Sequence, residues 1–117
     1  MTDQSALQNM TLAPGVVDTI ISITANEMEG VASVGSHMAS GIRQIWASRP
    51  STSGIETETD ENGKLVVTLH IEVYYGYVLP ELAEKLRQAI SDALLVQVGI
   101  EVARVDVYVD GIQFVRQ

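Results

Sequence analysis

Few side chains in this chain could do chemistry, and they are not spaced as a catalytic or metal site would need. His70 and Glu72 stand two residues apart on a predicted strand, so their side chains face the same side of it. An imidazole and a carboxylate can bind a metal ion, but a usual zinc site takes two further ligands. His37 has no second ligand at a matching spacing. The sequence therefore predicts neither a metal ion nor another cofactor.

The motifs of common enzyme classes are also missing from the sequence. No serine stands in a Gly-x-Ser-x-Gly elbow. The glycines from Gly30 to Gly41 lack the Gly-x-Gly-x-x-Gly spacing of a dinucleotide site and the Lys-Ser/Thr of a P-loop. With no cysteine there is no thiol nucleophile, no disulfide and no zinc-thiolate site. We predict no catalytic residues and no enzyme activity; a small hydrolase or a metal protein is the alternative.

Composition narrows the class of partner and the location. The chain has 117 residues, 46% of them hydrophobic, which predicts one domain with one modest core. Fifteen acidic residues against seven basic ones give a net charge of −8, which repels nucleic acid and anionic lipid surfaces. No apolar stretch is long enough to span a bilayer, and Met1 to Gln8 lacks the features of a secretory signal. We expect a cytoplasmic protein without nucleic-acid partners or direct membrane insertion.

Hydrophobic periodicity predicts two helices and three strands. In order, the expected elements are a helix from Pro14-Gly15 to a left-handed cap at Gly30, strands over 55–60 and 65–73, a helix over 80–97, and a strand over 100–109. Residues 31–34 are a candidate short extended run. Gly99 should end the second helix, and Asp110-Gly111 should break the last strand. Residues 1–9 are expected to be a flexible tail, and 10–115 a single domain.

The hairpin around Asn62-Gly63 has a predictable register. A two-residue turn would pair Ile55 with His70 and mix the two faces of the strands. A three-residue loop over 61–63 keeps the apolar partners on one face. It also places the opposite charges of Asp60 and Lys64 across from each other beside the turn. Its pairs are Asp60 with Lys64, Thr59 with Leu65, Thr57 with Val67, and Ile55 with Leu69. Gly63 then takes the left-handed bulge position.

These elements predict an α+β fold in the form of a two-layer sandwich. The order is helix-strand-strand-helix-strand, with a parallel, right-handed crossover from the second strand to the third. Both helices have one apolar stripe to bury, so we expect them on one face of a small mixed sheet. Residues 35–54 are rich in glycine and serine, and their role stays undefined.

The remaining candidates for function are aromatic residues suited to protein contacts. Tyr74 and Tyr108 should lie on the sheet face that the helices leave bare, Tyr75 and Tyr77 at the turn after the second strand, and Trp46 in the middle segment. Tyrosine and tryptophan are enriched at interfaces. The alternative is a solvated sheet face, with Trp46 packed as a satellite of the core. We predict that these residues contact a protein partner or a second copy of the chain.

A nucleic-acid module of the KH type is a second interpretation of the helix and strand pattern. Such modules use a Gly-x-x-Gly loop beside basic residues. The glycines from Gly35 to Gly41 do not have that spacing, and the net charge has the wrong sign. This interpretation is therefore kept only as an alternative.

Four segments together resemble the alkaline-shock-protein family of bacterial envelope-stress proteins. They are Met10-Thr11-Leu12-Ala13-Pro14-Gly15-Val16-Val17, Asn26-Glu27-Met28-Glu29-Gly30-Val31-Ala32-Ser33-Val34, Val73-Tyr74-Tyr75-Gly76-Tyr77-Val78-Leu79-Pro80-Glu81-Leu82-Ala83, and Glu101-Val102-Ala103-Arg104-Val105-Asp106-Val107-Tyr108-Val109-Asp110-Gly111-Ile112. The resemblance covers about residues 10–115. It implies a non-enzymatic protein of envelope homeostasis that self-assembles and sits near the membrane by binding a membrane-anchored protein.

Overall fold

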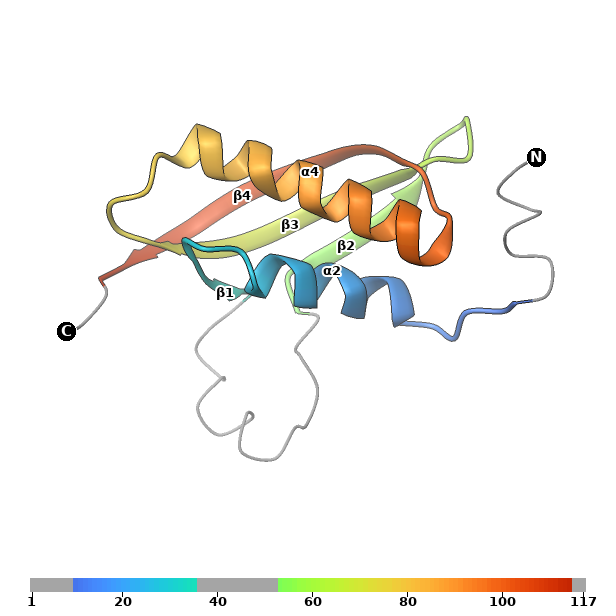
Figure 1. Cartoon of the computed structure of the whole chain (residues 1–117), viewed down its shortest axis with the longest axis horizontal. Helices are drawn as coiled ribbons and strands as arrows, with labels where there is room; N and C mark the ends of the chain where they lie inside the picture. The colour runs from blue at the N-terminus through green and yellow to red at the C-terminus, as the bar shows by residue number, and fades with distance from the viewer. Residues whose placement is uncertain (1–9, 36–52, 115–117) are drawn as a thin grey trace, which may run out of the picture.

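The computed structural model describes residues 10–35 and 53–114, and within them it confirms the α+β sandwich. Two helices lie together on one face of a four-stranded mixed sheet (Figure 1). The elements are α2 (Val16–Asn26), β1 (Val31–Val34), β2 (Ile55–Thr59), β3 (Leu65–Tyr74), α4 (Leu79–Val98) and β4 (Val102–Gln113). Their order is the predicted one, and the candidate extended run at 31–34 is confirmed as the short strand β1.

Strand β3 is the centre of the sheet. Strand β4 runs parallel to β3 along its whole length, from Leu65 to Tyr74. Strand β2 pairs antiparallel with the first half of β3, and β1 pairs antiparallel with the second half. Because β4 occupies one side of β3 throughout, β1 and β2 share the other side. Within the described residues, β1, β2 and β4 each leave an outer edge.

The hairpin has the predicted register. Ile55 pairs with Leu69, and Thr59 pairs with Leu65. The Asp60 N–H donates to the Lys64 carbonyl at 2.8 Å, and Gly63 adopts φ +81 in the left-handed region. The Asp60 carboxylate adds two bonds, because its Oδ1 accepts from the N–H groups of Asn62 and Lys64, each at 2.9 Å.

Two predicted boundaries were wrong. Asp110-Gly111 does not end the last strand, because the pairing continues to Gln113. Val109 pairs with Ile71 and Gly111 pairs with Glu72, so Asp110 is an extra residue that the strand accommodates as a bulge. The first helix does not reach Gly30 either; it ends at Asn26.

Gly30 instead lies in the turn that leads into β1 and adopts φ +104. The second helix ends as predicted, with Gly99 in a left-handed conformation and its N–H donating to the Leu95 carbonyl at 3.0 Å.

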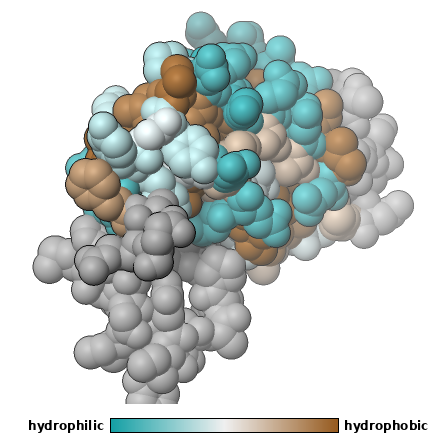
Figure 2. All heavy atoms as spheres, turned by 60° about the vertical axis from the view of Figure 1, so that its left-hand side comes forward, coloured by the Kyte–Doolittle hydropathy of each residue, from teal (hydrophilic) through white to brown (hydrophobic). Residues whose placement is uncertain are grey.

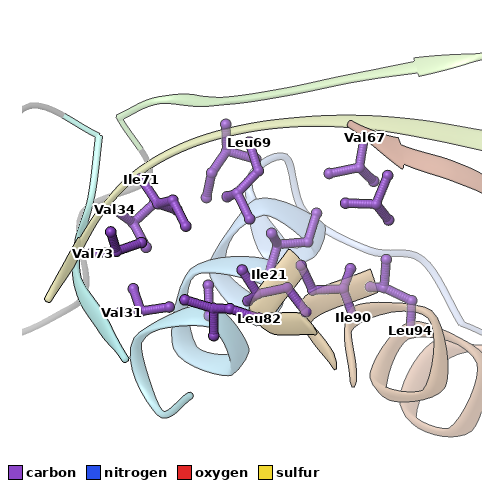
Figure 3. Packing of buried hydrophobic residues seen from close by; sticks show 14 of the residues in the cluster. Ile21, Val31, Val34, Val67, Leu69, Ile71, Val73, Leu82, Ile90 and Leu94 are labelled. Atoms are coloured by element: carbon purple, nitrogen blue, oxygen red, sulfur yellow. The ribbon is translucent and has the colours of Figure 1, made fainter. Parts of the chain in front are cut away.

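The core lies between the sheet and the two helices. Figure 3 shows side chains of β3 pointing toward those of α2 and α4. Alternate residues of β3 face this layer, while residues every three or four along α4 meet them, as the two periodicities require. Each large buried side chain contributes about 1.5–3 kcal/mol. The fully buried ones are Ile21, Val67, Leu69, Ile71, Val73, Leu86, Ile90 and Leu94.

Candidate interaction surface

The turn after β3 places Tyr75 against the end of β4. Gly76 adopts φ +106, a backbone conformation that favours glycine, so the chain can turn away from the sheet at once. The Tyr75 N–H donates to the Gln113 carbonyl at 2.7 Å, which extends the parallel pairing by one bond. The Tyr75 ring then meets the Phe114 ring with centroids 5.0 Å apart and planes tilted by 35°. Both remain largely in solvent, with Tyr75 66% and Phe114 71% exposed.

Tyr77 is held differently, against the turn between α2 and β1. A Cβ placed on the buried Gly30 would lie 3.0 Å from Tyr77 Cδ2, so the ring packs directly on the glycine. The Tyr77 hydroxyl donates to Glu29 Oε2 at 3.2 Å. Desolvation, the hydrogen bond and the nearby negative charge of Glu29 together raise the pKa of Tyr77 above its ordinary value. Tyr77 therefore ties the β3–α4 turn to the turn that follows α2.

Tyr108 belongs to a second aromatic group on the sheet face away from the helices, here called the open face. Its ring stacks on His70 with centroids 4.9 Å apart and an angle of 16°. His70 Nδ1 lies 3.0 Å from Asp110 Oδ2, so the bulge of β4 brings a carboxylate to the imidazole. Glu72, the other predicted ligand candidate, accepts instead from Gln113 Nε2 at 2.8 Å. His70 and Glu72 are thus held by different partners.

The structure divides the predicted site residues into two groups. Tyr75 and Tyr77 lie at the β3–α4 turn, and Tyr74 is half-buried beside it as the last residue of β3. Tyr108 lies farther back along the open face, on the strand residue that pairs with His70. Trp46 and His37 lie outside the described residues.

The end of the sheet around Tyr75 carries the larger apolar surface. We call Tyr75, Val78, Ile112 and Phe114 the docking end; each of these four side chains is more than half exposed. Figure 2 turns this end of the molecule forward and shows brown and pale side chains next to one another, with teal ones along the flank. Water-exposed aromatic and aliphatic side chains gathered at one place are typical of protein-contact surfaces.

Sequence reasoning did not find Ile112 and Phe114 as surface candidates. The predicted break at Asp110-Gly111 left both residues outside the last strand. The signal was the parallel crossover itself, because parallel strands bring their carboxyl ends to the same edge of a sheet. A predicted last strand that continued past Asp110 would have placed Phe114 beside Tyr75.

Within residues 10–35 and 53–114, no three His, Asp or Glu side chains gather where they could hold a metal ion. Nor is any helix in the described part of the chain long and apolar enough to cross a membrane. The contacts present at this end of the sheet are the Tyr75–Phe114 ring contact and the Tyr77–Glu29 hydrogen bond, beside exposed apolar side chains.

Comparison with known proteins decides the family. A sequence model of the family of alkaline shock protein 23, described as having a cell envelope-related function, matches residues 2–114. The chain belongs to this family. A relative, the uncharacterized protein YqhY of Bacillus subtilis (strain 168), is 23% identical over 112 residues, which cover 96% of this chain and 82% of the relative. No solved structure matches.

Membership in the alkaline-shock-protein family confirms the resemblance that the four sequence segments indicated. Three of those segments meet in the structure. The Tyr74 N–H donates to the Gly30 carbonyl at 2.9 Å, and Tyr75 bonds the end of β4. The residues that carry the resemblance thus form the framework of the docking end.

Proposed function

We propose that this protein is a non-enzymatic docking domain of cell-envelope homeostasis, located in the cytoplasm and held near the membrane by a membrane-anchored protein partner. The family's cell envelope-related function supports the process. The observation that carries the docking mechanism is the exposed Tyr75–Phe114 ring pair at the docking end. Rings already packed against each other lose little conformational freedom when a partner covers them.

The partner is expected to be a protein and not lipid or nucleic acid. The net charge of −8 opposes approach to anionic lipid headgroups and to phosphate backbones. The docking end adds aromatic and aliphatic area without a lysine or arginine among its four residues. Such a surface fits an apolar groove or helix on another protein.

Co-sedimentation with membranes tests this docking. Membrane vesicles from the native host should bind the protein, and trypsin treatment of those vesicles should abolish binding. Vesicles made of the host's lipids alone should not bind it. The double variant Tyr75→Ala/Phe114→Ala should lose binding, while Val96→Ala, an 81% exposed apolar residue on the last turns of α4, should not. Binding to protein-free vesicles, or unchanged binding by the double variant, would refute the proposal.

Self-association is the second part of the proposed function. The open face, with Tyr74 and the stacked Tyr108, is one surface that supports it, since amphipathic tyrosines suit an interface between copies. Sedimentation velocity over a wide concentration range tests this part. A monomer at the highest concentration would end it.

A further inference from the structure

The outer edge of β4 is a long strand edge without lysine or proline. Among the described residues no strand pairs with that edge, although β4 runs for 12 residues. The outward N–H and C=O groups of an edge strand are a template for another strand, and proteins commonly block them with lysine, proline, β-bulges or a short strand length. The two bulges of β4 lie toward its ends and leave the stretch from Arg104 to Val109 regular. β4 contains neither lysine nor proline, and its one basic residue is Arg104.

An apolar row follows this edge on the side of the helices. Val105 is 3% exposed, but Val109 is 39% and Ile112 55% exposed, so the row emerges into solvent toward the end of the strand. α4 crosses the sheet obliquely and does not bury these positions fully (Figure 1). A strand added at this edge would cover the exposed apolar side chains of the row. It would also form hydrogen bonds with the outward N–H and C=O groups of β4.

We propose that a second copy of this chain adds its own β4 to the edge, antiparallel, with a twofold axis at Val107. A twofold interface joins the same patch on both copies, so each contact occurs twice. In this register Val107 faces its own copy, and the other pairs are Asp106 with Tyr108, Val105 with Val109, Arg104 with Asp110, Ala103 with Gly111, and Val102 with Ile112.

The two irregularities of β4 fit this register. One extra residue precedes Arg104 and another is Asp110, so the bulges lie on both sides of the axis at Val107. Each bulge shifts the alternation by one residue, and Val102 and Ile112 therefore both face the helices, opposite Leu65 and Val73. Apolar residues thus oppose apolar residues on the helix side, as directly paired residues must share a face.

Charge selects this register among its neighbours. An axis at Asp106 would place two copies of that carboxylate directly opposite, and an axis at Tyr108 would oppose Asp106 to Asp110. An axis at Val105 opposes Arg104 to Asp106, but it pairs Val109 with Glu101 and leaves Asp110 without an opposite residue in the strand. The axis at Val107 opposes Arg104 to Asp110 twice and opposes no like charges.

This inference rests on the self-association part of the proposed function, but it assigns the contact to the β4 edge in place of the open face. The edge shares Ile112 with the docking end, and the other residues of the two surfaces differ. Binding to membrane vesicles tests the docking end, whereas oligomeric state tests the β4 edge, so either can fail without the other.

A charge-reversal series measured by sedimentation velocity tests the pairing. Arg104→Asp and Asp110→Arg each create two like-charge pairs and should raise the dimer dissociation constant roughly tenfold or more. An equimolar mixture of the two variants should form a heterodimer, because each altered residue then faces its opposite charge. The double variant Arg104→Asp/Asp110→Arg should dimerise on its own. Circular dichroism confirms that every variant is folded.

Two controls separate the alternatives. Thr68→Arg places a charge at the centre of the open face on β3, away from the edge, and should leave the dimer intact. Asp106→Arg should disturb association less than Asp110→Arg does. A monomeric wild type, a dimer lost only with Thr68→Arg, or stronger loss with Asp106→Arg than with Asp110→Arg would each overturn the proposal.

A cross-link tests the axis directly and does not depend on charged variants. Because the chain has no cysteine, Val107→Cys introduces one thiol, and at a twofold axis it faces its own copy. Oxidation should give a covalent dimer with Val107→Cys but not with Glu58→Cys, which lies on β2 at the other edge of the sheet. Equal yields from both variants would contradict the β4 pairing.

Discussion

Replacing Gly30 by alanine tests how the docking end is anchored to the core. Gly30 is buried, adopts φ +104, and accepts the Tyr74 N–H at its carbonyl. An alanine Cβ there would lie 3.0 Å from Tyr77 Cδ2 and 3.3 Å from Leu82 Cδ2. The substitution therefore strains the backbone and pushes the Tyr77 ring and the first turns of α4 at the same time.

The expected loss of unfolding free energy is the sum of a backbone cost and a packing cost. A non-glycine residue in a sparsely populated backbone region costs about 1–3 kcal/mol. Inserting a methyl group into a packed site costs about 1–3 kcal/mol more when the neighbours cannot move freely. We therefore expect Gly30→Ala to lower the free energy of unfolding by about 2–6 kcal/mol. Leu82 is buried and cannot yield easily, which favours the upper half of that range.

Urea unfolding followed by circular dichroism measures this loss, and Gly63→Ala is the matched control. Gly63 has a similarly positive φ of +81, but a Cβ there would meet nothing within 4 Å. Gly63→Ala should therefore lower the free energy of unfolding by the backbone cost alone, about 1–2 kcal/mol. Adding Tyr77→Ala to Gly30→Ala should recover part of the stability. The reasoning fails if the two glycine variants are equally stable, or if removing the Tyr77 ring recovers nothing.

Three further predictions concern the core, the hairpin and the pH dependence. Leu86→Ala empties a fully buried site on α4 and should cost about 2–5 kcal/mol in urea unfolding, and a cost below that of the exposed Leu95→Ala would contradict the core assignment. Asp60→Ala removes two hydrogen bonds of the β2–β3 turn and should cost about 0.5–1.5 kcal/mol, whereas Glu61→Ala should be nearly neutral. The pKa of Tyr77 is raised in the folded state, so the fold retains this proton longer than the unfolded chain does, and stability should fall as pH rises above about 10. Tyr77→Phe should make that fall shallower, and a pH profile identical to that of the wild type would refute the Tyr77–Glu29 contact.

The parts of the fold that could be predicted are those that depend on residues close together in the sequence. The β2–β3 register was predictable because only one loop length keeps Ile55 and Thr57 opposite apolar residues. α4 was predictable because its apolar spacing lies between Pro80 and Gly99.

The parts that could not be predicted depend on distant partners. The extended run at 31–34 was predicted, but its place in the sheet was not, because its partner Val73 lies far along the chain. Asp110 looks like a strand breaker in sequence, and it becomes a bulge because β3 continues to offer partners up to Tyr74. For the same reason the Tyr75–Phe114 contact depends on a parallel register that no local pattern reports.

The most direct test of docking as this protein's mode of action is complementation in its native host. A strain lacking the protein is exposed to envelope stress and supplied with wild type, Tyr75→Ala/Phe114→Ala or Val96→Ala at equal cellular levels. Our account predicts that wild type and Val96→Ala restore growth while the double variant does not, although it remains folded. Full restoration by the double variant would contradict the claim that the exposed rings at this end of the sheet carry the function.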